Sequence, residues 1–229
     1  MTSDHIRTLA CYLSQQNRKT ITQWIPGGAN FRFQDITIVS PPAAVAMMEE
    51  DTIRNGWFLH PQIGIKEDQS VIDIGSRYGE YTLTALALGA RHVYAFEKDL
   101  RLVKCLRENL RLNRYENTNY AEKCSVIHRV VSPIETTIDG YIFEESSVIP
   151  QNLKWIKVDC GGQDELNIVN GCYKTIEHYR PISVLMHLYG GMAEFNRFSE
   201  TFLIANSFDC KSVVTELKDD ELIVNTLIY

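Results

Sequence analysis

VIDIGSRYGEYT, at residues 71–82, is the stretch that decides the fold of this chain. It opens as an apolar run that ends in Asp73, turns at Gly75, and enters an expected helix near Gly79. Glycine suits such a turn because it adopts backbone conformations that other residues avoid, and because a ligand can approach it closely. The stretch therefore predicts a buried strand, a ligand-binding bend and a helix, in that order.

The spacing of this bend, D-x-G-x-x-x-G, differs from the G-x-G-x-x-G of dinucleotide-binding loops. A dinucleotide loop places the pyrophosphate on the N-terminus of the helix, whereas an acid at the strand end would repel that group. A carboxylate at this place suits a cationic amino group, such as the one at the methionine end of S-adenosylmethionine (SAM). The spacing therefore disfavours a nicotinamide oxidoreductase.

Strand and helix patterns alternate outward from this bend to the end of the chain. Near-continuous apolar strands with helices between them are typical of a parallel sheet covered on both faces. The acidic turn LKDDE, at residues 217–221, indicates that the last two strands form an antiparallel hairpin. We therefore expect an α/β, Rossmann-like, doubly wound, mostly parallel seven-stranded sheet with a C-terminal antiparallel hairpin. The expected strands are 70–74, 92–96, 125–131, 154–159, 182–188, 209–215 and 221–228, and the expected helices are 80–88, 99–113, 164–178 and 192–206.

The helix expected at 99–113 shows both a capping signal and a core stripe. Asp99 suits the N-cap because its side chain can accept a hydrogen bond from the first turn. The expected core stripe, at helical spacing, consists of Leu100, Val103, Leu106 and Leu110. The basic residues between them indicate a solvated outer face rather than a nucleic-acid surface.

The first third of the chain is expected to cap the rest. Residues 1–60 are predicted to form this cap, and residues 61–229 one compact ligand-binding unit. Within the cap we expect a helix at 4–16, a Gly/Pro/Asn break at 26–30, a strand or short hairpin at 31–39, and a helix at 41–54.

Composition and charge narrow the class of protein. With 229 residues, 45% of them hydrophobic and 23% charged, the chain is long enough for one well-buried domain. The formal net charge of −6 argues against a nucleic-acid partner. Six cysteines without a C-x-x-C pair argue against a structural zinc site and fit a reducing cytosol. Because no apolar run approaches the roughly 20 residues of a membrane span and no signal-peptide pattern is visible, we expect a cytoplasmic protein without a membrane partner.

The end of the second expected strand carries a further candidate ligand residue. The sequence AFEKD places Glu97 there, 24 residues after Asp73. A carboxylate at this place can accept hydrogen bonds from both hydroxyls of a ribose. Lys98 follows it and can flank an adenine ring. The two acids, in this order and at these strand ends, favour a nucleoside ligand.

These motifs resemble those of the FkbM-type SAM-dependent methyltransferases. DIGSRYGEYT (73–82) is similar to that family's D-[VI]-G-A-N-x-G-x-x-T, and Ala95-Phe96-Glu97 to its A-F-E-P. The resemblance continues to about residue 190: LRENLRLN (106–113) with L-x-x-N-x-x-L-N, residues 137–139 with T-L-D, residues 157–162 with K-I-D-V-E-G, and residues 180–187 with R-P-x-x-x-x-E-x-H.

The resemblance implies a fold of the class I methyltransferase type and SAM as the cofactor. It also implies transfer of a methyl group to a hydroxyl oxygen of a small-molecule or glycosidic substrate. Asp159 would lie beside the transferred methyl group. The residues expected to bind the cofactor are Asp73, Gly75, Ser76, Tyr78, Gly79, Glu97 and Lys98.

The departures from the family pattern fall mostly on the catalytic side. Gly161 stands where the family has a glutamate, and only Asp164 or Glu165 could replace that acid. Met186 stands near the place of the acid in the fifth strand, and HRVVS (128–132) offers no carboxylate or amide near the adenine. Two alternatives therefore stay open: a SAM-binding protein with lost or altered transferase activity, and an N-methyltransferase that acts on a macromolecule.

Two residues are candidates for the catalytic base. An alcohol nucleophile benefits from a base that removes its proton during attack. His187 has a side chain that titrates near neutrality, and the alternative for it is a strand-end histidine bonded to nearby backbone. Asp159, at the end of the fourth strand, is the other candidate. These residues together with Asp164 or Glu165 could ligate a divalent cation, but the spacing does not require one, and no metal is predicted.

Overall fold

The computed structural model describes residues 17–27, 30–40 and 65–229, the last range with gaps at 67, 116–117, 147–149, 163–164 and 217–220. The helices expected at 4–16 and 41–54 lie outside the described residues. No helix in the described ranges is long and apolar enough to cross a membrane.

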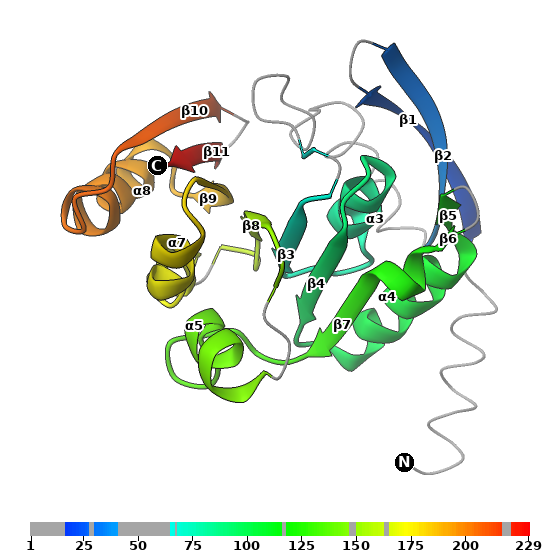
Figure 1. Cartoon of the computed structure of the whole chain (residues 1–229), viewed down its shortest axis with the longest axis horizontal. Helices are drawn as coiled ribbons and strands as arrows, with labels where there is room; N and C mark the ends of the chain where they lie inside the picture. The colour runs from blue at the N-terminus through cyan, green and yellow to red at the C-terminus, as the bar shows by residue number, and fades with distance from the viewer. Residues whose placement is uncertain are drawn as a thin grey trace.

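A seven-stranded sheet forms the centre of the molecule, in the order β10-β11-β9-β8-β3-β4-β7 (Figure 1). Only β11 runs antiparallel to its neighbours β9 and β10, and the remaining pairings are parallel. The expected mostly parallel sheet with a C-terminal antiparallel hairpin is therefore confirmed. The strands are β3 (Ser70–Ile74), β4 (His92–Glu97), β7 (Cys124–His128), β8 (Leu153–Val158), β9 (Ile182–Tyr189), β10 (Cys210–Glu216) and β11 (Glu221–Ile228).

Helices cover both faces of this sheet (Figure 1). Because successive side chains of a strand point to opposite faces, Val71 packs on one side with α3 (Glu80–Ala87) and α4 (Leu100–Leu112). Ile72 packs on the other side, in the larger apolar cluster. That side carries α5 (Ile138–Gly140), α6 (Glu165–Asn170), α7 (Tyr173–Tyr179) and α8 (Gly191–Phe198), with the π-helical turns η4 (Tyr141–Glu145) and η5 (Ser199–Ile204).

The helix expected at 164–178 is in fact two helices. The break falls after Asn170, where Gly171 donates its N–H to Asn167 and accepts a hydrogen bond from the N–H of Asp139. The Asp139 carboxylate then accepts hydrogen bonds from the N–H groups of Lys174 and Thr175, at 2.8 Å each. A side chain from α5 therefore caps α7 and restarts the helix. In the segment 137–139, which resembles T-L-D, Asp139 thus has a structural role as the cap of α7.

Smaller differences concern the ends of elements. The Asp99 cap is confirmed, since its carboxylate accepts a hydrogen bond from the N–H of Arg101 at 2.8 Å. Leu100 is 37% exposed and lies outside the core stripe, which the other three residues form. The strand expected at 125–131 ends at His128, and the helix expected at 192–206 continues beyond Phe198 only as a π-helical turn.

A two-stranded antiparallel hairpin precedes the main sheet, formed by β1 (Asn17–Gly27) and β2 (Asn30–Ser40). The strand expected at 31–39 is confirmed as part of β2, whereas β1 was not anticipated. The expected break at 26–30 coincides with the end of β1 and the start of β2. In Figure 1 the hairpin lies beside α4 and the small β5 (Arg114–Tyr115) and β6 (Thr118–Asn119) pair.

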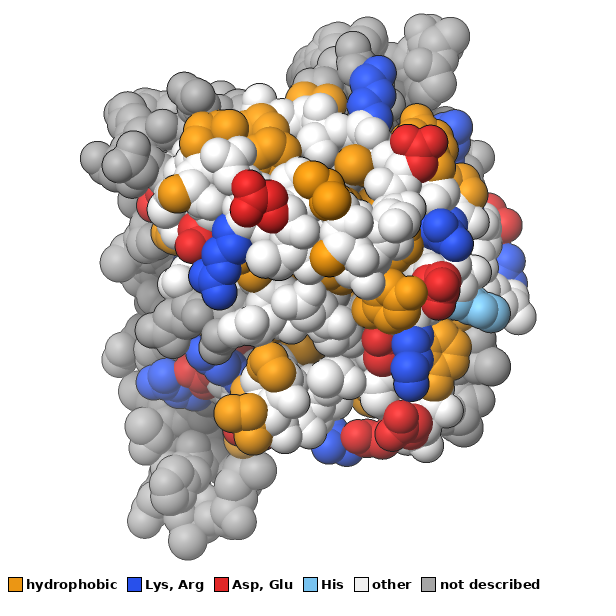
Figure 2. All heavy atoms as spheres, turned by 90° about the vertical axis from the view of Figure 1, so that its left-hand side faces the viewer, with side chains coloured by type: hydrophobic (Ala, Val, Ile, Leu, Met, Phe, Trp, Pro, Cys, Tyr) orange, Lys and Arg blue, Asp and Glu red, His pale blue; other side chains and the backbone are white. Residues whose placement is uncertain are grey.

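The surface at the opposite end of the sheet is mixed in charge. Figure 2 views the molecule from the side of α8 and β10 and shows acidic and basic side chains interspersed among uncharged ones. Among the described residues of this face, no continuous basic area stands out. The described part of this face therefore shows no sign of a nucleic-acid surface. In open α/β sheets ligands bind at the carboxyl ends of the parallel strands.

Candidate cofactor and acceptor site

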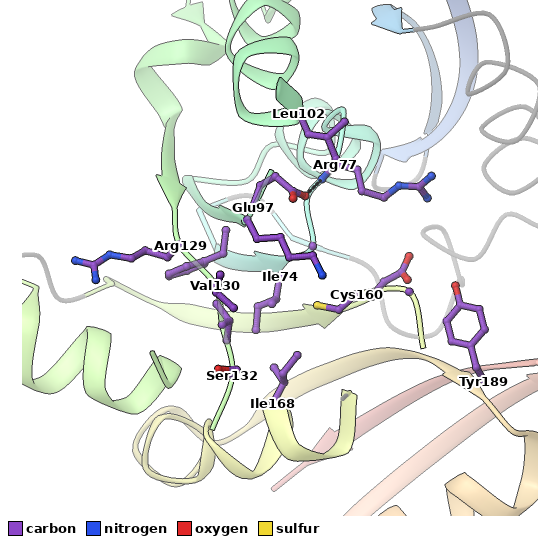
Figure 3. Close-up of a pocket in the computed structure, with 16 residues that line it drawn as sticks. Ile74, Arg77, Glu97, Leu102, Arg129, Val130, Ser132, Cys160, Ile168 and Tyr189 are labelled. Atoms are coloured by element: carbon purple, nitrogen blue, oxygen red, sulfur yellow. Dashed lines mark hydrogen bonds between the residues drawn. The ribbon is translucent and has the colours of Figure 1, made fainter. Parts of the chain in front are cut away.

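A pocket of about 420 Å³ opens at the carboxyl ends of β3, β4, β7 and β8 (Figure 3). Its lining comes from the last residues of β3 and β4 and from the segments that follow the four strands, together with Leu102 of α4, Ile168 of α6 and Tyr189 of β9. This volume is within the range of roughly 300–1,000 Å³ that small-molecule sites occupy. The pocket lies where ligands of open α/β sheets bind.

The glycine bend is held between the strands on either side of it. Gly75 and Ser76 both donate their N–H groups to the carbonyl of Phe96, at 3.0 and 3.1 Å. Gly75 has φ +74°, and a Cβ there would lie 1.9 Å from the carbonyl oxygen of Asp159. Gly79, at φ +95°, would bring a Cβ to 2.3 Å from Leu106 of α4. Both glycines are therefore required by backbone conformation and by close packing.

Asp73 lies under the bend rather than at the pocket wall. It is fully buried, accepts a hydrogen bond from Thr82 Oγ1 at 2.6 Å, and forms an ion pair with Lys157 Nζ at 3.1 Å. Lys157 also donates to the carbonyl of Gly75 at 2.8 Å. Burial lowers the pKa of Lys157, but the attraction of Asp73 and Asp159 together outweighs burial and raises that pKa above its usual value. Lys157 therefore neutralises the Asp73 carboxylate, which does not line the pocket, and the role of Asp73 in binding a cationic ligand stays a prediction.

Glu97 does face the pocket, from the end of β4. Its two carboxylate oxygens accept hydrogen bonds from the N–H groups of Arg77 and Asp99, each at 2.9 Å, and the first of these is the dashed line of Figure 3. A carboxylate has about four lone-pair sites, so both oxygens can accept a further hydrogen bond each. The backbone therefore fixes Glu97 in place and leaves acceptor capacity for a ligand.

The remaining predicted cofactor residues divide between the pocket and the core. Lys98 is exposed and lines the pocket. Ser76 and Tyr78 are buried outside the lining. Ser76 Oγ donates to the Phe96 carbonyl at 3.3 Å, and the Tyr78 carbonyl accepts a hydrogen bond from Asn109 of α4 at 2.8 Å. Both residues therefore hold the loop through contacts on the side that faces away from the pocket.

Several pocket residues were not anticipated from the sequence. The apolar walls include Leu102 of α4, Val130 after β7 and Ile168 of α6, which lie far apart along the chain. Arg77 is half-buried, has φ +48°, and directs its side chain toward the end of the pocket where Tyr189 stands (Figure 3). Its position in the bend, two residues after Gly75, is the sequence feature that could have predicted Arg77 as a pocket residue. The attraction of Glu80 and Asp159 outweighs burial and raises the pKa of Arg77, so this side chain is a fixed cation.

Asp159 also lines the pocket, on the other side of β3 from Glu97; it follows β8 and is 8% exposed. Burial raises its pKa, but hydrogen bonding to His187 and the charges of Lys157, His187 and Arg77 outweigh this and bring the pKa to about 2. His187 Nδ1 lies 3.7 Å from Asp159 Oδ1, and His187 Nε2 lies 3.0 Å from Glu221 Oε2. Asp159 is therefore ionised at neutral pH.

His187 is placed behind Asp159 and does not line the pocket. Burial lowers its pKa, but the carboxylates of Asp159 and Glu221 outweigh burial and raise the pKa above its usual value. Asp159 lines the pocket, whereas His187 does not. The geometry therefore favours Asp159 over His187 as the group that meets a substrate.

The loop after Asp159 is shaped by two glycines and a buried acid. Gly161, at φ +88°, has no heavy atom within 4 Å of where a Cβ would be, whereas a Cβ on Gly162 would lie 2.8 Å from the ring of Tyr189. Glu165 accepts hydrogen bonds from the N–H groups of Cys160 and Gly162, at 3.1 and 2.8 Å. Glu165 therefore holds this loop and does not line the main pocket, and Asp164 lies outside the described residues.

Neither a thiol nucleophile nor a metal cluster is indicated at this end. Burial raises the pKa of the Cys160 thiol to about 12, so it stays protonated at neutral pH. Among the described residues, no group of three His, Cys, Asp or Glu side chains is arranged to hold a metal ion.

Comparison with known proteins gives a consistent fold and a short sequence match. No protein-family profile matches the chain. A segment of 97 residues, 39% of this chain, is 34% identical to ribosomal protein L11 methyltransferase of Ruminiclostridium cellulolyticum and covers 30% of that protein. The crystal structure of methyltransferase FkbM from Methylobacillus flagellatus superposes with a TM-score of 0.56 at 15% identity, over 73% of this chain and 45% of that one. Precorrin-6y C5,15-methyltransferase from Geobacter metallireducens gives 0.50 at 12% identity, over 77% and 88%.

The strand order completes the assignment of the fold. Numbered along the chain, the seven strands lie in the order 3-2-1-4-5-7-6, with the seventh antiparallel. This is the order of the class I SAM-dependent methyltransferases, and the superposed structures share their fold. The chain therefore has the class I methyltransferase fold, with a pocket where that fold places its ligand.

Proposed function

We propose that this protein is a SAM-dependent methyltransferase that acts on a hydroxyl oxygen of a small molecule or sugar. The observation that carries the proposal is the position of Glu97. In a class I methyltransferase fold, a buried carboxylate with spare acceptor capacity stands at the end of the second strand and faces a pocket of about 420 Å³.

The residues of the pocket fit the parts of SAM. Glu97 suits the two ribose hydroxyls, and the apolar side chains of Leu102, Val130 and Ile168 suit the adenine ring. The Arg77 guanidinium suits the methionine carboxylate. Gly161 leaves open space where a larger side chain would reduce the room for the ligand. Asp73 supports the bend through Lys157, which donates to the carbonyl of Gly75.

Catalysis in this proposal depends on positioning and on one proton acceptor. SAM supplies an electrophilic methyl group on a sulfonium sulfur. The enzyme holds the acceptor hydroxyl in line with that methyl group, which accounts for most of the rate enhancement in such displacements. An oxygen that gains a methyl group becomes strongly acidic, so even a carboxylate with a pKa of about 2 can take its proton. Asp159 Oδ is the proposed acceptor of that proton.

A protein acceptor is the second candidate, because the sequence relative named above is a ribosomal protein methyltransferase. The match covers only 30% of that relative. A ribosomal protein is therefore included among the acceptors to be tested and is not the substrate that we expect. A small hydroxylated acceptor needs only the pocket described here.

The experiment combines ligand binding with product detection. Thermal-shift measurements with SAM, S-adenosylhomocysteine and NAD should show stabilisation by the first two only. Release of S-adenosylhomocysteine is then measured with hydroxylated small molecules, sugars and ribosomal proteins as acceptors. Product with a small hydroxyl compound supports the proposal. Binding without product from any acceptor would favour a SAM-binding protein that has lost transfer, and binding of NAD alone would refute both.

A further inference from the structure

We propose that Glu221 and His187 are positioning residues that hold the Asp159 carboxylate toward the pocket, with the His187 imidazole hydrogen-bonded to Glu221 and in charge contact with Asp159. This assignment rests on the proposed function, since it concerns the group that receives the substrate proton. Glu221, His187 and Asp159 are called the charged triad below. Glu221 is the last residue of the acidic turn LKDDE and the first residue of the antiparallel strand β11, and the sequence analysis gives it no role in binding or catalysis.

The sheet register brings the triad together. Glu221 pairs directly with Tyr189, and His187 pairs with Ile223. Because side chains two residues apart in a strand share a face, His187 and Tyr189 lie on the same side of β9, and Glu221 lies on that side of β11. Asp159 follows the end of β8, the other neighbour of β9. The triad therefore joins three adjacent strands at their pocket end.

The contacts leave His187 enclosed by charge and by an aromatic ring. Nε2 lies 3.0 Å from Glu221 Oε2, Nδ1 lies 3.7 Å from Asp159 Oδ1, and the Tyr189 ring lies 4.2 Å away, centroid to centroid, at 33°. The His187 side chain is 7% exposed, whereas that of Glu221 is 33% exposed. Among the described residues, Asp159, Glu221 and Tyr189 are the titratable groups that face the imidazole from β8, β11 and β9.

Charge balance explains why Glu221 is needed. A buried cation beside a single carboxylate would meet only part of its hydrogen-bonding capacity, and a second carboxylate on the other ring nitrogen stabilises the protonated form. The protonated imidazole in turn attracts the Asp159 carboxylate, whose Oδ1 lies 3.7 Å from Nδ1, and thereby orients it. Without Glu221, His187 loses its proton at a lower pH, and the contact that holds Asp159 weakens.

The test compares three variants of the triad and one control variant by steady-state kinetics across pH, with the acceptor that gives product. Glu221→Gln and His187→Gln should lower kcat roughly 10- to 100-fold, the cost of misplacing a reacting group by about an ångström, with KM for SAM nearly unchanged. In Glu221→Gln the loss of activity at alkaline pH should begin at lower pH than in the wild type, because His187 deprotonates earlier. Glu221→Asp should restore part of kcat, and Glu200→Gln, an exposed carboxylate far from the triad, should match the wild type.

A second measurement stands independently of catalysis. The pKa of His187, followed by NMR of its imidazole nitrogens, should lie above the usual value and fall in Glu221→Gln. An unchanged His187 pKa and an unchanged kcat in Glu221→Gln would overturn the proposal. A higher KM for SAM at constant kcat would also overturn it, because Glu221 would then act on the cofactor. If the His187 pKa falls as expected while no acceptor gives product, the triad stands as a structural unit and the proposed function fails.

Discussion

Two ends of the pocket, named here for Glu97 after β4 and for Asp159 after β8, lie on either side of β3 and are built in different ways. At the Glu97 end, backbone groups make the decisive contacts: two N–H groups of the bend bond to the Phe96 carbonyl, and two more bond to the Glu97 carboxylate. At the Asp159 end, side-chain charges make them, through His187 and Glu221.

This difference sets how each end should respond to change. A site held by backbone contacts fails when the main chain is strained, and it is insensitive to pH near neutrality. A site held by charged side chains fails when one partner is removed or titrated, while the main chain stays in place. The following predictions use these two modes of failure, from the largest expected effect to the smallest.

The largest effect is expected from Gly75→Val. Its side chain would overlap the Asp159 carbonyl, 1.9 Å from the Cβ position, at a φ of +74°. The free energy of unfolding should fall by more than about 4 kcal/mol, or no folded protein should be recovered. Denaturant unfolding measures this loss. Gly161→Ala is the matched control, because its Cβ meets open space and it should cost only about 1–2 kcal/mol for the left-handed backbone.

The buried pair under the bend comes next. Asp73→Asn leaves the Lys157 ammonium buried without its counter-charge, so the free energy of unfolding should fall by about 3 kcal/mol. The affinity of the remaining folded protein for S-adenosylhomocysteine, measured by calorimetry well below the melting temperature, should change much less. A loss of affinity without a loss of stability would show instead that Asp73 contacts the ligand directly.

Glu97→Gln should weaken the binding of S-adenosylhomocysteine roughly 10- to 100-fold, as expected for loss of charge-assisted hydrogen bonds. The amide keeps the shape of the side chain but offers one acceptor oxygen to the N–H groups of Arg77 and Asp99. Isothermal titration calorimetry measures the change. Glu122→Gln, on an exposed glutamate, should bind as the wild type does; equal affinity of both variants would remove Glu97 from the site.

Arg77→Gln should have a selective and smaller effect. Affinity for S-adenosylhomocysteine should fall about 10-fold, in line with loss of one charged contact to a carboxylate. Affinity for 5′-methylthioadenosine, which lacks the amino-acid part, should not change. Competition binding with the two ligands decides this, and an equal loss for both would place Arg77 elsewhere on the cofactor.

The smallest effect is the pH dependence of stability from Asp159. Because the folded pKa is held at about 2, below the unfolded value of 3.8, its stabilisation is present above pH 3.8 and is lost as the pH falls through the folded pKa. The difference in melting temperature between wild type and Asp159→Asn should therefore shrink by a few degrees from about pH 6 to about pH 3. A difference that stays constant over this range would show that Asp159 is not paired in the folded state.

The same contrast explains what the sequence could predict. The bend, Glu97 and the Asp99 cap are local patterns, in which residues close along the chain determine the conformation. Alternation of apolar strands and helices was likewise sufficient for the seven-stranded sheet with its terminal hairpin. The break in the helix at Gly171 was missed because its cause, the Asp139 carboxylate, comes from another element.

The Asp159 end of the pocket was harder to predict for the same reason, because its contacts come from separate elements. Glu221 and His187 meet only through the register of an antiparallel strand pair, which the composition of neither strand reveals. The ion pair of Asp73 with Lys157 on the adjacent strand was likewise not predicted, because the sequence does not show which side chain lies opposite a strand-end acid. Charge pairs between strands depend on tertiary structure, and no local spacing encodes them.

A crystal structure of the protein with S-adenosylhomocysteine tests the central claim most directly. The ribose hydroxyls should lie within hydrogen-bonding distance of the Glu97 carboxylate, with the adenine ring against Leu102 and Val130. A ligand bound away from Glu97, or a pocket that stays closed to S-adenosylhomocysteine at saturating concentration, would contradict the account.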